Sequence, residues 1–252
     1  MAIRFLTALP VYNEVSHVDA VLDEVLRFSP HVLVVDDGST DGTRELLSRR
    51  SDIEVIRHER NQGYGAGLRS AFEFARQQGY DVLVTIDCDG QHEPKRIPEF
   101  VAATQRAAVV SGSRYLQTFD GDSLPPVDRR RINVEITAEL NRRFGFNLTD
   151  AFCGFKAYRA DALAKLDIHE LGYAMPLEAW AQIAAAGLEV LELPVPLIYL
   201  DEARSFGGAL DNAKERLAYY YRVLDKSQAD VRPQSTSGVW PNVDVAQASC
   251  RS

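Results

Sequence analysis

The feature that most constrains the fold of this chain is the alternation of short apolar runs with amphipathic segments over residues 3–111. The apolar runs predict β-strands at residues 3–9 (ended by Pro10), 31–35, 53–57, 81–86 and 107–111. Helices are predicted after a Ser16 cap, after a Thr40 or Asp41 cap, over residues 67–77 and from Pro94 onward. Such alternation produces right-handed βαβ units, so we expect an α/β fold with a mainly parallel sheet flanked by helices.

The second half of the chain is less regular. Helical patterns are predicted at residues 129–144, 177–186 and 209–224, and extended segments at residues 149–158 and 188–199. From residue 228 onward the chain is rich in Ser, Gln, Pro and Asp and shows no period. We therefore expect one domain over residues 1–227 and a flexible tail over residues 228–252.

Composition excludes several classes of protein. The 252 residues contain 28 Lys+Arg and 36 Asp+Glu, and the net charge of −8 argues against a nucleic-acid-binding protein. The three cysteines form no CxxC pair, so a disulfide scaffold is not expected. No apolar run reaches the roughly 18 residues of a membrane-spanning helix, and the first ten residues do not read as a signal peptide. These features predict a cytoplasmic protein.

Polar residues follow several predicted strands, and parallel sheets bind ligands beyond the carboxyl ends of their strands. The sharpest segment is residues 87–92, Asp-Cys-Asp-Gly-Gln-His. Asp87 and Asp89 can offer carboxylate oxygens to one Mg²⁺ or Mn²⁺, and Gln91 can add an amide oxygen. The alternative is a polar turn with solvated carboxylates. His92 could also bind metal, but a histidine in a turn is more often solvated, and that is what we expect. We expect Cys88 to be packed in the core.

Three further segments follow strand ends. Asp37 can accept hydrogen bonds from a base or a ribose, although its turn also suits helix capping. Tyr12 offers an aromatic face on which a base could stack, or it simply covers the end of the sheet. Residues 63–67, Gly-Tyr-Gly-Ala-Gly, lack the acidic partner of a dinucleotide fingerprint, so we favour a helix entry that a ligand or backbone approaches closely.

Together these segments resemble the family-two glycosyltransferases of the GT-A fold, and the polyprenyl-phosphate sugar transferases are the most similar subgroup. The resemblance runs over roughly residues 1–225. It is carried, in the family's order, by residues 9–14, 34–43, 61–65, 87–92, 112–115 and 153–156.

The resemblance implies roles for particular residues. The nucleotide would contact Pro10, Tyr12, Asn13, Glu14, Asp36, Asp37, Ser39, Gly63, Asp87 and Cys88. A Mg²⁺ or Mn²⁺ ion on the diphosphate would be held by Asp87, Asp89 and Gln91. Phosphate groups would face Arg114, Arg204 and one arginine of the 129–131 run, Arg130 or Arg131. The catalytic carboxylates would be Asp89, Asp150 and Glu178, although Glu178 also suits a helix-surface or capping role.

Two segments depart from the family pattern. Residues 153–156 read Cys-Gly-Phe-Lys where a Ser-Gly-Phe-Arg-like stretch is usual. Residues 206–209 read Phe-Gly-Gly-Ala, so a lysine expected to bind phosphate in the late loop is missing.

The resemblance implies an inverting, metal-dependent transfer of a hexose from a nucleotide-diphosphate sugar, GDP-mannose or UDP-glucose, to a polyprenyl phosphate. A phosphate acceptor is already anionic and needs no general base, and no late Glu-Asp pair of the kind used with hydroxyl acceptors is found. Two alternatives stay open: transfer to a hydroxyl in polysaccharide or cell-envelope synthesis, and a non-catalytic nucleotide-sugar-binding protein. The amphipathic segment 129–144 suggests peripheral membrane contact, or else a helix packed on the sheet.

Overall fold

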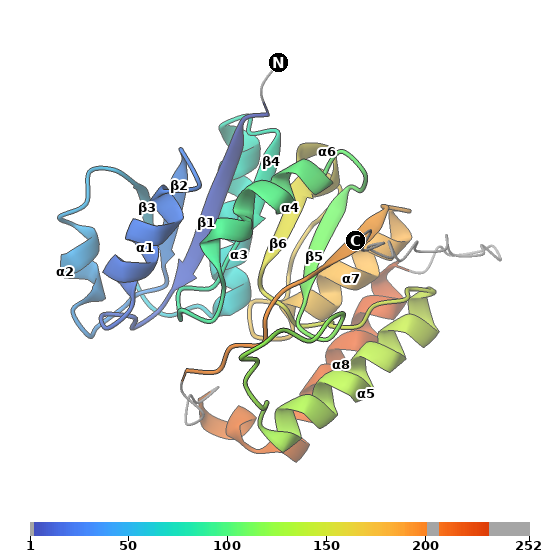
Figure 1. Cartoon of the computed structure of the whole chain (residues 1–252). Coiled ribbons are helices and arrows are strands. Elements are labelled where there is room, and N and C mark those ends of the chain that lie inside the picture. Colours follow the sequence, from blue (N-terminus) through green and yellow to red (C-terminus); the bar gives the residue numbers. More distant parts are fainter. Residues whose placement is uncertain (1–2, 201–206, 232–252) are drawn as a thin grey trace.

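The computed structural model describes residues 3–200 and 207–231, and they contain a seven-stranded sheet flanked by helices (Figure 1). The strands are β1 (Phe5–Val11), β2 (Val32–Asp36), β3 (Glu54–Arg57), β4 (Val82–Thr85), β5 (Val109–Ser113), β6 (Lys156–Arg159) and β7 (Val190–Pro194). Their order across the sheet is β3-β2-β1-β4-β6-β5-β7. This is the expected α/β architecture.

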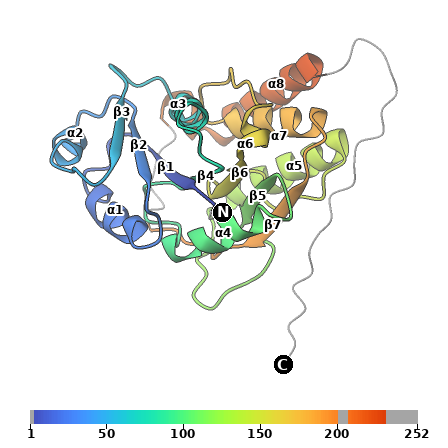
Figure 2. The same ribbon diagram turned by 90° about the horizontal axis from the view of Figure 1, so that it is seen from above.

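Helices cover both faces of the sheet (Figure 2). They are α1 (Val18–Leu26), α2 (Thr43–Leu47), α3 (Tyr64–Gln77), α4 (Ile97–Ala103), α5 (Val127–Phe144), α6 (Ala160–Leu163), α7 (Met175–Ala185) and α8 (Ala213–Val231), with short 3₁₀ turns η1 (Pro94–Arg96) and η2 (Gly208–Asp211). One core lies between the sheet and α1 and α4, and the other holds the apolar faces of α3, α5, α7 and α8.

One strand of the sheet is reversed. β6 runs antiparallel to both β4 and β5, whereas the other neighbouring pairs in the described sheet are parallel. Lys156, the first residue of β6, therefore pairs with Thr85 at the end of β4 and with Ser111 near the end of β5. The reversal brings residues 150–155, which precede β6, to the edge where the parallel strands end.

Several predicted boundaries were wrong. β1 continues through Pro10 to Val11 because the pairing with β4 ends at Ala8, so on that side no ladder bond is lost by the missing N–H. The N-cap of α1 is His17, not Ser16. Gly42 is the N-cap of α2, although Asp41 Oδ1 does accept from Thr43 N at 3.0 Å.

Other differences lie in the later elements. α3 begins at Tyr64 rather than at residue 67. The strand expected over residues 149–158 is reduced to β6. α8 extends to Val231, so residues 228–231 are helical and do not belong to a tail, while residues 232–252 lie outside the described part.

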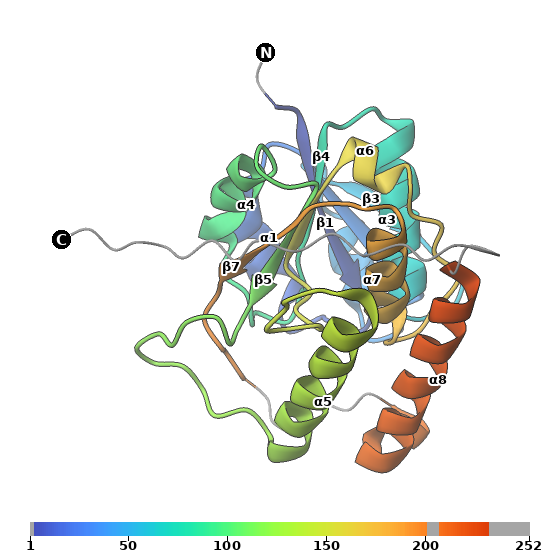
Figure 3. The same ribbon diagram turned by 90° about the vertical axis from the view of Figure 1, so that its right-hand side faces the viewer.

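The helix α5 packs on the body of the protein, beside α8 (Figure 3). The four apolar residues of its every-fourth-residue stripe are completely or almost completely buried: Ile132, Ile136, Leu140 and Phe144. This stripe is therefore not available to a membrane. Within the described ranges, no helix combines the length and apolar character that crossing a bilayer demands.

Candidate active site

A cavity of about 830 Å³ lies at the carboxyl edge of the sheet. Of the residues predicted from the sequence, it is lined by Pro10, Tyr12, Asn13, Glu14, Asp37, Gly63, Asp87, Cys88, Asp89, Gln91 and Arg114. The predicted residues outside its lining are Asp36, Ser39, Arg130, Arg131, Asp150 and Glu178. Arg204 lies outside the described residues.

Asp37 is buried at the end of β2 and holds the segment that leads into α3. Its carboxylate accepts from the backbone N–H of Gln62 at 2.9 Å and of Gly63 at 2.7 Å. Nδ1 of His58 lies 2.6 Å from Asp37 Oδ1. A ligand that bound Asp37 would therefore share an acceptor already used by the protein, and its contact with the nucleotide remains a prediction.

Asp36 and Ser39 support the cavity wall from behind. Asp36 is fully buried, and its Oδ1 accepts from Ser39 N at 2.9 Å. Ser39 Oγ in turn accepts from Asn13 N at 2.9 Å, and Asn13 Oδ1 accepts from Thr40 N at 2.8 Å. Asn13 has a φ of 56°, a left-handed conformation that these bonds fix. The two loops thus position one another.

The glycines of residues 63–67 make room for backbone rather than for a dinucleotide. A Cβ on Gly63 or Gly65 would overlap carbonyl oxygens of Leu171 and Glu170. The Leu171 oxygen also accepts from Ala66 N at 3.2 Å, within the first turn of α3. The backbone alternative for this segment is therefore confirmed.

Asp87 and Asp89 face the cavity from the segment after β4. Tyr64 donates its hydroxyl to Asp87 Oδ1 at 3.1 Å, and His92 Nε2 lies 3.2 Å from Asp87 Oδ2. The expectation of a solvated His92 was wrong, because its side chain is only 6% exposed and packs edge-on against Phe155. Cys88 is buried in the core, as expected.

The donor set of this segment suits a hard cation bound through few protein ligands. The described part of the chain contains no cluster of three or more His, Cys, Asp or Glu side chains that could enclose a metal. Two carboxylates at a cavity wall nevertheless match Mg²⁺, which usually keeps waters and substrate phosphates in its other positions. The residues present therefore fit a metal held jointly by protein and substrate.

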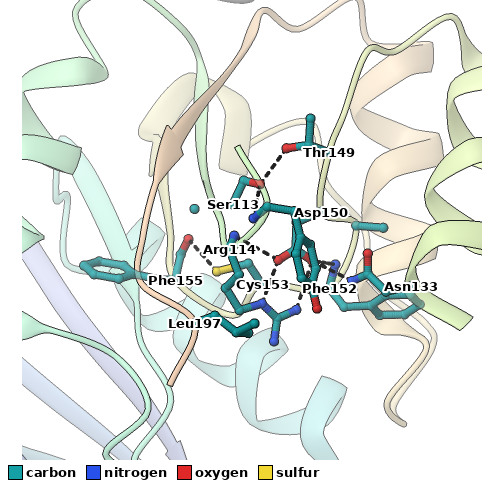
Figure 4. Close-up of polar contacts among 12 residues, drawn as sticks. Ser113, Arg114, Asn133, Thr149, Asp150, Phe152, Cys153, Phe155 and Leu197 are labelled. Atoms are coloured by element: carbon teal, nitrogen blue, oxygen red, sulfur yellow. Dashed lines mark hydrogen bonds and ion pairs between the residues drawn. The ribbon is translucent and has the colours of Figure 1, made fainter. Parts of the chain in front are cut away.

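Asp150 is a buried partner of Arg114 (Figure 4). Arg114 donates Nε to Oδ2 at 2.7 Å and Nη2 to Oδ1 at 2.9 Å, and Asn133 donates to Oδ1 at 2.8 Å. Burial alone would raise the pKa of Asp150, but the charge and hydrogen bonds of Arg114 hold it well below its usual range. A carboxylate so weakly basic and outside the cavity lining is poorly suited as a general base. Its structural effect is to orient Arg114, which does line the cavity.

Glu178 anchors a loop. Its Oε2 accepts from the backbone N–H of His169 at 2.9 Å and of Glu170 at 2.7 Å. It therefore holds the loop whose carbonyl groups pack on the first turn of α3. Glu178 is therefore neither a helix-surface charge nor a helix cap, because its side chain is buried and the N–H groups that it binds belong to the loop before α7.

The arginine run at the start of α5 divides into three environments. Arg130 lies 3.7 Å from the ring centre of Tyr115, and Arg131 is exposed beside Asp128. Arg129 lines the cavity, as does Arg216 of α8, which the sequence analysis missed. The available signal for Arg216 was its place on the buried stripe of α8, four residues before Tyr220.

Comparison with known proteins identifies the family. Residues 7–167 match the family model described as glycosyl transferase family 2. The chain belongs to this family. Undecaprenyl-phosphate mannosyltransferase of Micrococcus luteus is 31% identical over 83% of this chain and 90% of that protein. Polyprenol monophosphomannose synthase of Mycolicibacterium smegmatis is 31% identical over 76% of each.

The fold is also shared with a solved structure. Glucosyl-3-phosphoglycerate synthase from Mycobacterium tuberculosis, in complex with uridine diphosphate, superposes with a TM-score of 0.66. The two chains are 17% identical, and the match covers 97% of this chain and 88% of the other. This family-two glycosyltransferase therefore has the GT-A fold. The family match ends at residue 167, so Arg216 and Tyr220 line the cavity from beyond it.

The carboxylate of Asp87 lies against Gly154, where there is no room for a side chain. A substitution of this glycine is therefore expected to change the activity. A Cβ at position 154 would overlap all three atoms of the Asp87 carboxyl group. Gly154→Ala is therefore expected to displace Asp87 and lower the rate of sugar transfer by about tenfold or more, as misplaced catalytic groups do. Gly121→Ala is the control: its φ of 87° strains the backbone of any L residue and so costs some stability, but nothing lies within 4 Å of the added Cβ and Gly121 does not line the cavity, so the rate should change less than twofold. Equal rates for the two variants would contradict the prediction.

Proposed function

We propose that this glycosyltransferase moves a hexose from a nucleotide-diphosphate sugar to a polyprenyl phosphate, with inversion at the anomeric carbon. The observation that carries the proposal is the composition of the cavity wall. Asp87 and Asp89, which follow β4, line the cavity, and so do Arg114, which follows β5, and Arg129 of α5. A wall with carboxylates on one side and guanidinium groups on the other suits a metal-bound diphosphate and a second anion.

The donor would occupy the side of the cavity formed by residues 10–14, Asp37 and Gly63. Asp87 and Asp89, with Gln91, would hold Mg²⁺ or Mn²⁺ against its diphosphate. When bound, such a cation stabilises the negative charge that builds on the leaving diphosphate. Mannose appears in the names of both relatives, which favours GDP-mannose over UDP-glucose as the donor.

The acceptor would place its phosphate beside Arg114 and Arg129. A phosphate oxygen is already charged at neutral pH, so attack on the anomeric carbon requires positioning rather than proton removal. The positions of Asp150 and Glu178 agree with this, because neither of these predicted catalytic carboxylates lines the cavity. Both relatives carry a polyprenyl acceptor in their names.

We also propose peripheral attachment at the cytoplasmic face of a membrane. With the apolar stripe of α5 buried, the support comes from the start of that helix. Leu124 is 87% exposed and Val127 83% exposed, beside the arginine run 129–131. Aliphatic side chains flanked by cationic ones suit an interface with anionic lipid.

The proposal is tested by incubating the chain with radiolabelled GDP-mannose or UDP-glucose, Mg²⁺ or Mn²⁺, and a polyprenyl phosphate. Label that enters the organic phase only with the lipid phosphate supports it. Label that stays in the aqueous phase, in a saccharide product, would indicate the alternative hydroxyl acceptor. If no nucleotide sugar raises the melting temperature of the metal-loaded protein, donor binding itself is disproved.

A further inference from the structure

The cavity extends beyond the family-matched residues to a wall built by η2 and α8. Leu210, Arg216 and Tyr220 line this wall, and Arg129 of α5 lines the same cavity. We propose that Arg216 binds the phosphate group of the acceptor, as a second guanidinium beside Arg129. This inference rests on the proposed prenyl-phosphate acceptor and assigns a function to the C-terminal helix of the described chain.

The direction of the Arg216 side chain is fixed by backbone. Nη1 donates to the carbonyl oxygen of Leu210 at 2.6 Å and to that of Asp211 at 3.5 Å. Arg216 as a residue is only 5% exposed. These two carbonyl bonds fix the direction of the Arg216 guanidinium, so the wall presents a cationic group in a preformed position.

The surrounding charges favour an anion at this place. Burial is the main cause that lowers the pKa of Arg216, and the charge of Arg129 lowers it further. Asp128 and Asp211 act in the opposite direction, so the two arginines are partly balanced within the protein. A phosphate bound between guanidinium groups offsets both the burial and the repulsion through charge-assisted hydrogen bonds.

The apolar neighbours of this wall identify the rest of the ligand. Ile132, Tyr199, Leu210 and Tyr220 line the cavity near the two arginines. Ile132 and Tyr220 are almost fully buried, so little of either side chain is exposed to solvent. Cations beside these apolar residues match a monophosphate ester of a hydrocarbon, in which charge and apolar chain are adjacent.

The test uses a water-soluble prenyl monophosphate, farnesyl phosphate, and its neutral analogue farnesol. In Arg216→Gln, the Kd and KM for farnesyl phosphate are expected to rise about tenfold or more, the effect of losing a hydrogen bond to a charged group. The KM for the nucleotide sugar and the weak binding of farnesol should stay within twofold. Arg216→Lys keeps the charge but not the planar, two-pronged donor geometry of the guanidinium, so its affinity for farnesyl phosphate should fall less than that of Arg216→Gln.

A matched control lies on the same helix. Arg222 is exposed and points its guanidinium at the ring of Tyr219, so Arg222→Gln should leave both KM values unchanged. Melting temperatures of all variants show whether each one folds. If Arg216→Gln does not fold, Arg216→Lys is compared with the original chain instead.

The outcomes separate the two proposals. If the unmodified chain binds farnesyl phosphate no more tightly than farnesol, the proposal of a prenyl-phosphate acceptor is wrong. The proposed role of Arg216 is then wrong as well, because it rests on that acceptor. If it prefers farnesyl phosphate and Arg216→Gln shows the same preference, only the role of Arg216 is overturned. Equal losses for donor and acceptor would indicate a structural arginine and would also overturn the inference.

Discussion

Asp89→Asn is expected to reduce sugar transfer roughly a thousandfold, the loss that follows when several kcal/mol of charge stabilisation by a metal are removed. Asp89 lines the cavity and its Oδ1 accepts from Gln91 N at 3.0 Å, a bond that the asparagine oxygen can also accept. The turn should therefore survive while one of two carboxylates is lost. The readouts are the rate of transfer and the Mn²⁺-dependent rise in melting temperature that the donor causes.

The control for this variant removes an acidic charge far from the cavity lining. Glu99 is exposed on α4, and Glu99→Gln should retain full activity and the full donor effect on melting. An Asp89→Asn protein that transfers sugar within tenfold of the original rate would refute a metal held by this carboxylate. Unchanged metal dependence of donor binding would refute it independently of turnover.

Asp150→Ala is expected to give the largest loss of stability, about 3 kcal/mol of unfolding free energy, because it removes a fully buried carboxylate and leaves the half-buried Arg114 without its charge partner. Asp150 is fully buried and accepts from Arg114, Asn133 and the backbone of Phe152. Urea denaturation measures the change. The exposed pair of Arg159 and Asp161 provides the control, since Asp161→Ala should cost at most about 1 kcal/mol.

The same pair predicts a pH dependence. The pKa of Asp150 in the folded chain lies below its ordinary value of 3.8, so folding favours the carboxylate form. Its contribution is complete at pH values above 3.8 and is lost as the pH falls toward the folded pKa. Unfolding free energy should therefore fall less steeply below about pH 5 in Asp150→Ala than in the original chain. Identical slopes would show that Asp150 does not titrate with folding.

The regular first half of the fold was predictable because its elements carry local patterns. The first five predicted strands correspond to β1–β5, with ends shifted by a few residues. β6 was predicted too long, over residues 149–158, since its four residues are ordered by antiparallel pairing with β4 and β5 rather than by a pattern of their own. The start of α3 was misplaced because glycines disfavour helix, and contact with the loop at Leu171 overrides that preference.

The candidate site was predictable where its residues directly follow the ends of strands. Asp37, Asp87 and Asp89 fall at the cavity as expected, because the ends of neighbouring parallel strands meet there. Arg130 or Arg131 was expected where Arg129 lines the cavity, since consecutive helical residues point about 100° apart and the sequence does not fix the rotation of the helix. Asp150 is buried in an ion pair with Arg114, which lies thirty-six positions away in the sequence. No local sequence pattern predicts this pair.

The contact between the loop at residues 170–172 and the first turn of α3 sets an order of events during synthesis. A nascent chain that ends after β5 already contains every residue predicted to touch the nucleotide. It lacks, however, the carbonyl groups that fill the space over Gly63 and Gly65 and the acceptor for Ala66 N–H. The pocket proposed for the donor is thus completed only when residues 170–172 have been added, and we expect chains that end before them to bind nucleotide sugar more weakly.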